Sequence, residues 1–306
     1  MRTIKRSVMG MSQTKEESLY IGIDGGGSKC RATIYTHDYC ILGTGVAGRA
    51  NPLHGLAQTF QSIEESTQLA LSDAGLKPSD SRRLIAGLGL AGVNVPRLYQ
   101  DIAKWQHPFA SMYLTTDLHT ACIGAHQGEE GAVTITGTGS CGYARVGDKE
   151  LFLGGHGFAL GDKGSGAWLG LKASESALLD LDGFGEKTLL TQRLLQHFEV
   201  SNALGIVENL AGQSSSTYAK LAHIVFECAR LDDGVALDIV REGANYISQL
   251  VRKLFEISPP RFSMIGGLAE PLAPWLAEDV LAKLSPSLQP PEWGAAFFAQ
   301  QQYTKA

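Results

Sequence analysis

The sequence predicts an α/β protein of two domains, and three observations support this. First, the apolar stretch over residues 19–23 is typical of a buried strand, and it runs into Asp24, a glycine-rich turn and a second strand. Second, the same layout returns over residues 133–146, where Gly137 follows Gly25 by 112 residues. Third, a chain of 306 residues is long enough for two domains of ordinary size.

The first turn contains three glycines, followed by Ser28 and Lys29. Glycine loses more conformational entropy on folding than any other residue, so three in a row indicate a close backbone approach rather than a gain in stability. Consecutive N–H groups in such a turn can bind an anion, and the carboxylate of Asp24 is well placed to hold a hydrated Mg²⁺ that neutralises phosphate charge. A plain β-hairpin explains this stretch equally well when it is taken alone.

The second turn, Gly-Thr-Gly-Ser at residues 137–140, strengthens the phosphate-binding interpretation. A repeat at this distance favours two related domains that each present a phosphate-binding hairpin to a shared cleft. Residues 137–142 also match G-x-G-x-x-G, but a dinucleotide-binding fingerprint must open a helix, whereas residues 143–146 continue as a strand. The sequence contains no Walker A motif.

The first half is expected to begin with an antiparallel meander and to continue with strands that alternate with helices, an α/β pattern with an antiparallel edge. The expected strands are 19–23, 30–36, 41–47, 84–90 and 112–116, and the expected helices are 54–74, 96–106 and 118–126.

The second half repeats the meander and then becomes mainly helical. We expect strands over 133–136, 143–146, 151–153 and 261–265, and helices over 166–181, 186–197, 216–230, 234–255, 272–284 and 293–303. The helices before 261–265 have no counterpart in the first half and form an insertion. The expected organisation is a loose amino-terminal extension (1–18), a first domain (19–117) and a second domain (118–306), whose last helix is free to pack back on the first domain.

Composition excludes several classes of protein. A formal net charge of -5 without a run of basic residues argues against a nucleic-acid partner. The longest apolar stretch, residues 84–95, is too short to cross a membrane, and the first 18 residues lack the apolar core of a signal peptide, so we expect a cytoplasmic protein. The five cysteines form no C-x-x-C pattern, which favours reduced thiols over a disulfide framework or a zinc site. A homodimer is one candidate for the oligomeric state.

Asp117 is the strongest candidate for a catalytic group. It follows the expected strand 112–116 and precedes a helix, in the predicted crevice between domains, where a carboxylate could accept a proton from a substrate hydroxyl. The alternative is that Asp117 only caps the helix, which aspartate does well.

Asn51 and Asp162 lie in glycine-rich settings and could bind sugar hydroxyls, with ordinary turn chemistry as the alternative.

These stretches together resemble the superfamily of actin, hexokinase and the heat-shock chaperone ATPases. The closer resemblance is to the N-acetylglucosamine and glucosamine kinases, which are grouped with the BadF/BadG/BcrA/BcrD-type ATPases. It extends from about Tyr20 to Tyr303. The motifs that carry it are residues 24–29, 116–117, 137–140, 161–165 and 266–267.

The resemblance implies two ribonuclease-H-like (actin-like ATPase) domains around a central cleft, the second with a helical insertion, and it implies ATP and Mg²⁺ as cofactors. Asp24 would position Mg²⁺, Asp117 would activate the 6-hydroxyl of the sugar, and the other residues would bind the two substrates. The implied nucleotide-binding residues are Asp24, Gly26, Gly27, Ser28, Lys29, Thr138, Gly139, Gly266 and Gly267, and the implied sugar-binding residues are Asn51, Gly155, His156 and Asp162. The animal N-acetylglucosamine kinases carry a tryptophan where this chain has His156, which leaves the choice between the acetylated and the free amino sugar open.

The resulting hypothesis is an ATP-dependent kinase that forms the 6-phosphate of N-acetylglucosamine or glucosamine. One alternative is an ATPase activator of a CoA-ester dehydratase or reductase, a class that holds an iron–sulfur cluster between subunits; the five scattered cysteines argue against it. The other is a non-catalytic sugar sensor, which would need neither Mg²⁺ nor a base.

Overall fold

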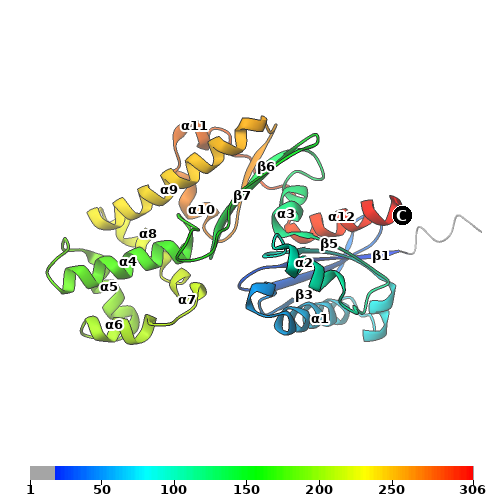
Figure 1. Ribbon diagram of the computed structural model, residues 1–306, viewed down its shortest axis with the longest axis horizontal. Helices are drawn as coiled ribbons and strands as arrows, with labels where there is room; N and C mark the ends of the chain where they lie inside the picture. The colour runs from blue at the N-terminus through cyan, green and yellow to red at the C-terminus, as the bar shows by residue number, and fades with distance from the viewer. Residues whose placement is uncertain (1–17, 306) are drawn as a thin grey trace, which may run out of the picture. The chain divides into compact units, whose positions relative to one another are not determined.

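The computed structural model describes residues 18–305, and these form two compact units (Figure 1). Among the described residues, unit 1 contains Ser18 to Gly124 together with Pro290 to Lys305, and unit 2 is Ala125–Gln289. Apart from Ser18, the extension expected over residues 1–18 lies outside the described residues. Each unit has its own β-sheet with helices, which confirms the predicted α/β class.

Unit 1 is built on a five-stranded sheet of order β3-β2-β1-β4-β5. Its strands β1, β2 and β3 are antiparallel, whereas β4 and β5 run parallel to β1. The strands are β1 (Leu19–Gly25), β2 (Cys30–Tyr35), β3 (Ile41–Ala47), β4 (Leu84–Leu90) and β5 (Ser111–Thr116). The helices are α1 (Leu56–Asp73), α2 (Pro96–Ala103), α3 (Asp117–Ala125) and α12 (Pro291–Lys305), with short 3₁₀ turns at Pro52–His54 and Pro78–Arg83.

Glycines allow two helices to approach the sheet of unit 1 closely. A Cβ built on Gly45 of β3 would lie 2.1 Å from the backbone oxygen of Ser66 in α1. On the sheet's other face, a Cβ on Gly22 would lie 1.7 Å from the backbone oxygen of Glu292 in α12, and one on Gly87 of β4 would lie 1.9 Å from that of Ala295. Because α12 packs on β1 and β4, the segment after unit 2 completes unit 1.

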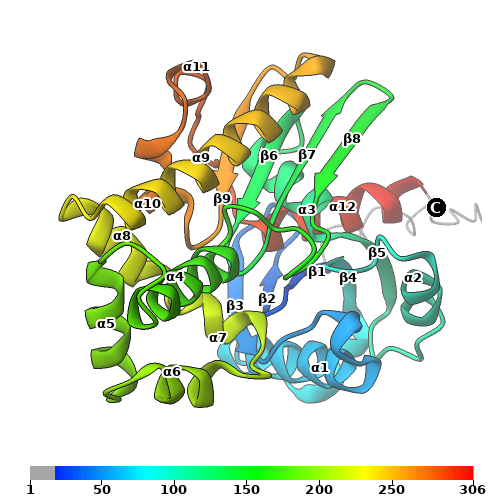
Figure 2. The same ribbon diagram turned by 60° about the vertical axis from the view of Figure 1, so that its left-hand side comes forward.

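Unit 2 contains a four-stranded sheet of order β8-β7-β6-β9 (Figure 2). The strands are β6 (Gly131–Thr136), β7 (Ser140–Val146), β8 (Lys149–Gly154) and β9 (Phe262–Ile265). The β6-β7-β8 meander is antiparallel and β9 is parallel to β6, which repeats the relation between β1-β2-β3 and β4 in unit 1. The sequence repeat therefore corresponds to a repeat of topology.

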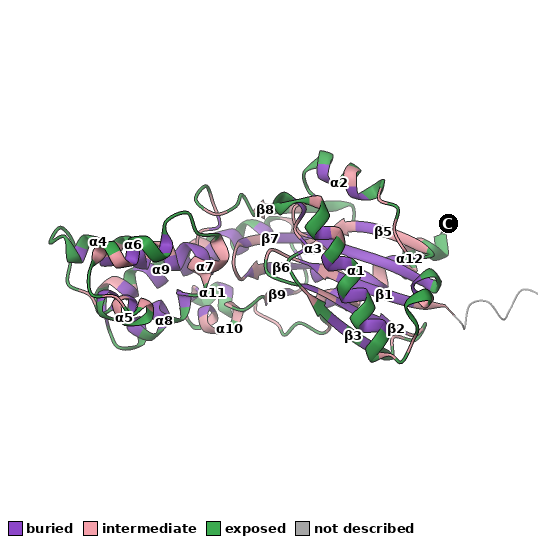
Figure 3. Cartoon of the chain, turned by 90° about the horizontal axis from the view of Figure 1, so that it is seen from below, coloured by how far each residue is buried: buried purple, intermediate pink, exposed green. Residues whose placement is uncertain are grey.

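Between β8 and β9 lie the helices predicted as an insertion. They are α4 (Gly166–Leu181), α5 (Leu189–Phe198), α6 (Ala203–Leu210), α7 (Ser215–Ala219), α8 (Ala222–Arg230) and α9 (Gly234–Leu254). Their buried faces enclose a shared apolar core, while the outer surfaces of α5 and α6 are largely exposed (Figure 3).

Three predictions about the helices of unit 2 were wrong. The helix expected over 216–230 is two helices, α7 and α8, and α6 was not expected although Asn202 caps it by accepting a hydrogen bond from Gly205 N–H. The helix expected over 272–284 is broken into α10 (Ala269–Leu272), a 3₁₀ turn (Ala273–Trp275) and α11 (Glu278–Leu281). Pro274 accounts for this break, since proline disrupts a helix interior.

Among the described residues, none of the helices combines the length and the apolar character needed to cross a bilayer.

Candidate functional site

The turn between β1 and β2 in unit 1 is short and closed. Gly26 N–H donates to the Lys29 carbonyl over 2.9 Å, and the side chains of Ser28 and Lys29 are exposed. A Cβ built on Gly27 would meet nothing within 4 Å, and one on Gly26 would meet only the Lys29 carbonyl, at 3.8 Å. Protein packing therefore does not require these two glycines, and the space in front of them can admit a ligand.

Two neighbouring loops fix this turn to the sheet. Ala50 N–H donates to the Gly26 carbonyl over 3.0 Å, and Ala91 N–H donates to the Gly25 carbonyl over 2.9 Å. Asn51 follows Ala50, and its Oδ1 accepts a hydrogen bond from Leu53 N–H over 3.0 Å. The turn chemistry considered for Asn51 is thus present, and it leaves the amide N–H groups as what Asn51 would offer a ligand.

Asp117 begins α3, but Thr116 is the residue whose side chain caps that helix. Thr116 Oγ1 accepts the His119 N–H over 3.2 Å, the usual bond of a helix cap, while Asp117 Oδ1 accepts the adjacent Leu118 N–H over 2.9 Å. Thr116 thus makes the capping bond that the alternative assigned to Asp117, and a catalytic role for Asp117 stays a prediction.

Asp24 and Asp117 belong to the same unit. In the register of the sheet Asp24 on β1 is level with Gly89 on β4, which is level with Thr115 on β5, so Asp117 lies two residues beyond that level. A larger residue cannot replace Gly89 without a clash, since a Cβ there would lie 2.0 Å from Thr120 Oγ1 in α3. Both carboxyl groups are half-buried.

Burial raises the pKa of both carboxyl groups. Burial, followed by the negative charges of Asp117 and Glu292, raises the pKa of Asp24 to about 7, against smaller opposing effects of Lys29 and Arg31. Burial raises the pKa of Asp117 to about 6, and the Leu118 N–H opposes this. With a pKa of about 6, the Asp117 carboxylate is suited to general-base chemistry near pH 7, because it accepts a proton readily while remaining mostly ionised.

The hairpin of unit 2 is joined to the start of α4. Gly137 N–H donates to the Gly139 carbonyl over 2.9 Å, and the Gly137 carbonyl accepts Gly166 N–H over 2.8 Å. The Thr138 carbonyl accepts Ala167 N–H over 3.2 Å. The turn at Thr138 and Gly139 is thus held by the same helix that follows the glycine-rich loop.

Asp162 lies under this hairpin. It is only 8% exposed, its Oδ1 accepts Gly157 N–H over 3.3 Å, and a Cβ on Gly139 would lie 2.7 Å from its Oδ2. Burial raises its pKa, against opposing hydrogen bonds and the charge of His156. The turn chemistry considered for Asp162 is therefore present here too.

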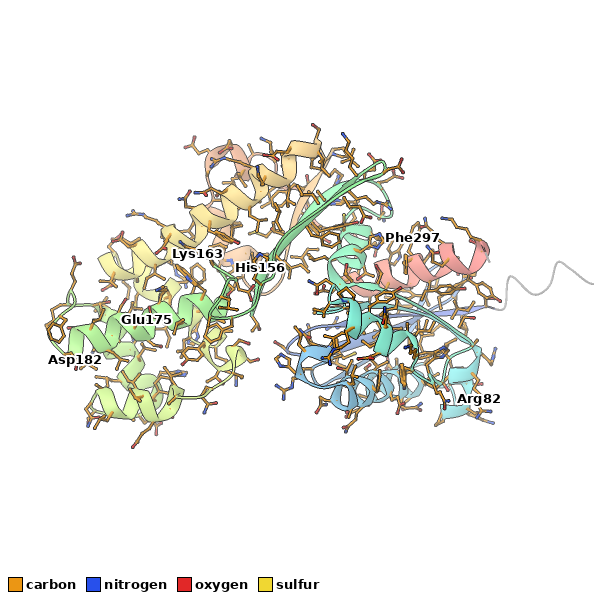
Figure 4. The ribbon with its side chains drawn as sticks, viewed as in Figure 1. Arg82, His156, Lys163, Glu175, Asp182 and Phe297 are labelled. Atoms are coloured by element: carbon orange, nitrogen blue, oxygen red, sulfur yellow. The ribbon has the colours of Figure 1, made fainter. Side chains whose placement is uncertain are left out.

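Gly155 and His156 belong to the same loop. Gly155 N–H donates to the Ser140 carbonyl over 3.0 Å, and the His156 side chain is exposed. Figure 4 labels His156 and Lys163 on this loop between β8 and α4. Unit 2 therefore brings Thr138, Gly139, Gly155, His156 and Asp162 into one neighbourhood.

Gly266 and Gly267 follow β9 beside the same hairpin strand. Gly266 has a φ of 110°, and a Cβ there would lie 2.3 Å from the Thr136 carbonyl oxygen, whereas a Cβ on Gly267 would meet nothing within 4 Å. The next segment borders a cavity of about 650 Å³, lined by Phe226, Arg230, Glu270, Pro271, Pro274 and Trp275. Sequence reasoning missed these six residues, because α8 and the segment around α10 are far apart in the chain and carry no shared motif.

The described residues contain no group of three or more His, Cys, Asp or Glu side chains arranged to hold a metal ion. Mg²⁺, however, is usually bound by one or two carboxylates together with substrate phosphates and waters. Asp24, a carboxylate beside a glycine turn open to ligands, fits that requirement.

Comparison with known proteins shows that this chain is similar to kinases of amino sugars. A crystal structure of a putative N-acetylglucosamine kinase from Chromobacterium violaceum superposes with a TM-score of 0.87, is 28% identical and covers 92% of this chain and 99% of its own. The glucosamine kinase of Vibrio cholerae is 33% identical over 85% of this chain and 88% of its own length. An N-acetylmuramic acid/N-acetylglucosamine kinase of Clostridium acetobutylicum is 27% identical over 78% of this chain and 79% of its own length.

The fold is therefore the two-domain, actin- and hexokinase-like fold of sugar kinases. Within that class the chain belongs to the BadF/BadG/BcrA/BcrD ATPase family, which it matches over residues 21–299. Membership of an ATPase family makes ATP its nucleotide.

Proposed function

We propose that this protein is an ATP-dependent kinase that phosphorylates an amino sugar, N-acetylglucosamine or glucosamine, at the 6-hydroxyl. The observation that carries the proposal concerns Asp117. Thr116, and not Asp117, makes the capping bond of α3, and burial raises the pKa of Asp117 to about 6. The similarity to a glucosamine kinase and to an N-acetylmuramic acid/N-acetylglucosamine kinase supports the choice of substrate.

Asp117 is the proposed general base. Its carboxylate would accept the proton of the sugar 6-hydroxyl as the oxygen of that hydroxyl bonds to the γ-phosphorus and the bond from that phosphorus to ADP breaks. The Leu118 N–H, bonded to Oδ1, would restrain the orientation of the carboxylate. Because phosphoryl transfer depends mainly on positioning and on neutralising charge, the other residues of the site act by binding.

For the nucleotide, the open turn at Gly26 and Gly27 would contact phosphate oxygens through backbone N–H groups, with Ser28 and Lys29 beside them. Asp24 would hold Mg²⁺, which neutralises phosphate charge when it is bound. Thr138 and Gly139 are the proposed phosphate contacts of unit 2. Gly266 and Gly267 would border the nucleoside, and the neighbouring cavity offers Trp275 as an aromatic surface for a purine.

For the sugar, Asn51, Gly155, His156 and Asp162 are the proposed contacts. Asp162 is positioned by the loop that it stabilises, and its Oδ2 borders the glycine hairpin, where it could accept a hydrogen bond from a sugar hydroxyl. His156 is the exposed member of the set and is the residue most able to adapt to a substituent on C2.

The test is ADP release with Mg-ATP and a panel of glucosamine, N-acetylglucosamine, glucose and N-acetylmannosamine, alongside a reaction without sugar. Strong stimulation by an amino sugar, with the product phosphorylated at O6 by NMR, supports the proposal. Hydrolysis that no sugar stimulates would instead favour the dehydratase-activator alternative. That alternative has to account for Cys30, Cys122 and Cys228, which are buried within the units.

Cytoplasmic location and a homodimer remain predictions. A cytoplasmic kinase has direct access to ATP, and light scattering of the purified protein measures the oligomeric state.

A further inference from the structure

Arg31 lies opposite Asp24 in the sheet of unit 1. The two residues are register partners on the antiparallel strands β2 and β1, so their side chains project from the same face with Cβ atoms ~5 Å apart. This spacing puts the guanidinium within reach of the Asp24 carboxylate. Within residues 18–305, however, no ion pair joins Arg31 to Asp24; Arg31 Nη1 lies 3.6 Å from Glu292 Oε1.

Glu292 comes from α12, the helix that follows unit 2 in the chain and packs on β1 (Figure 1). Gly22 allows this contact, since any side chain there would collide with the Glu292 backbone. Gly22 is two residues before Asp24, and alternate residues of a strand share a face. The same packing therefore brings Glu292 to the side of the sheet that carries Asp24 and Arg31.

Helix stability alone does not explain why Glu292 is buried. An acidic residue in the first turn of a helix interacts favourably with the helix dipole, but an exposed one would suffice. Glu292 is only 5% exposed, and burying a carboxylate is costly unless it is paired. Its charge also reaches Asp24, where it opposes the effects of Lys29 and Arg31.

The guanidinium is not fully engaged by Glu292. Its Nε is buried and makes no hydrogen bond within the described part of the chain. A cation in this situation would pair with another carboxylate within reach if Glu292 lost its charge, and Asp24 is its cross-strand neighbour.

We propose that Glu292 is a positioning residue that restrains Arg31, so that Arg31 does not pair with Asp24 and the Asp24 carboxylate stays available to Mg²⁺ and the nucleotide phosphates. The inference rests on the metal site in the proposed function, and it gives α12 a role in that site. Glu292 acts through Arg31 and touches neither substrate.

The experiment measures ADP affinity by calorimetry as a function of Mg²⁺ concentration, for the wild type and for Glu292→Gln, Arg31→Met and the double variant. Glutamine preserves the shape of Glu292 but removes its charge. We expect Glu292→Gln to raise the Mg²⁺ concentration needed for half-maximal enhancement of ADP affinity by roughly five- to tenfold, a coupling of ordinary size between sites. The double variant should recover most of this loss, because Arg31 is no longer present to capture Asp24.

A matched control is Asp279→Asn in unit 2, which removes the carboxylate of the exposed Arg252–Asp279 ion pair. It should leave the Mg²⁺ requirement unchanged. If Glu292 were only structural, Glu292→Gln would lower thermal stability while keeping the wild-type Mg²⁺ requirement, and the double variant would show no recovery. An unchanged Mg²⁺ requirement in Glu292→Gln overturns the inference, and so does the absence of recovery in the double variant.

The inference and the proposed function can fail separately. A wild type that phosphorylates amino sugars, combined with an unchanged Mg²⁺ requirement in Glu292→Gln, refutes only the inference. A wild type whose ADP affinity does not respond to Mg²⁺ refutes the inference together with the proposed metal site. The predicted shift in Glu292→Gln without any sugar phosphorylation supports the inference and refutes the proposed kinase.

Discussion

Replacing Asp117 by Asn separates the proposed catalytic role of this residue from a structural one. Asparagine keeps a side-chain oxygen that can accept the Leu118 N–H, as Oδ1 of Asp117 does, but it cannot take up the proton of a hydroxyl. The α3 cap should be unaffected, because Thr116 makes the capping bond to His119 N–H. We therefore expect a loss of turnover without a loss of stability.

The size of the loss follows from general-base catalysis. A positioned base contributes about 10²–10⁴-fold, which corresponds to roughly 3–5 kcal/mol of transition-state stabilisation. Asp117→Asn should lower kcat by that factor and leave the dissociation constant for ADP within about twofold of the wild type, because the proposed nucleotide contacts do not include Asp117.

The assay is coupled ADP release under saturating substrates, together with thermal unfolding and ADP calorimetry on the same preparations. Thr116→Val is the matched control: it removes the cap and should destabilise the protein by about 1 kcal/mol. An Asp117→Asn enzyme with more than a tenth of wild-type kcat would refute the assignment. A variant that is inactive and also unfolded at the assay temperature would show that the carboxylate has a structural role.

Three further predictions come from the same unit. The pH profile of kcat/KM should fall as the pH drops through about 6, since the pKa of Asp117 is raised to about 6 and the protonated form cannot accept a proton; a profile that stays flat down to pH 5 would contradict this. Gly22→Ala should destabilise the protein by about 1–3 kcal/mol or more in denaturant unfolding, because its Cβ meets the Glu292 backbone. Gly27→Ala, where a Cβ meets no protein atom within 4 Å, should keep wild-type stability and weaken ATP binding. A Gly27→Ala variant that is less stable than Gly22→Ala but binds ATP as tightly as the wild type would argue against a ligand at the turn.

The sequence was most informative where a motif acts locally. The strand–glycine–strand pattern and its repeat predicted both meanders, and α4 has the predicted bounds of 166–181. These features depend on residues that are close together in the chain, such as the Ser165 side chain that caps α4 by accepting Trp168 N–H. Periodicity and capping signals describe such elements well.

The sequence was least informative where the site depends on contacts between distant segments. Glu292 meets Arg31 across 261 positions of the chain, and the cavity lined by Phe226 and Trp275 combines α8 with the segment around α10. Asp117 illustrates an intermediate case. Aspartate and threonine are both good helix caps, so only the hydrogen-bond geometry distinguishes Thr116, which makes the capping bond, from Asp117, the proposed base.

The position of α12 in the chain has a consequence for synthesis. Because α12 follows all of unit 2, a ribosome produces every residue of unit 2 before the helix that covers β1 and β4 exists. Until then, the face of the sheet that includes Tyr20 and Ile85 lacks its covering helix, and exposed apolar surface of this kind is what chaperones bind on incomplete chains. A nascent chain therefore cannot enclose the surroundings of Asp24 early, and a product truncated before Pro290 would carry the glycine turn and Asp117 without the helix that supports them.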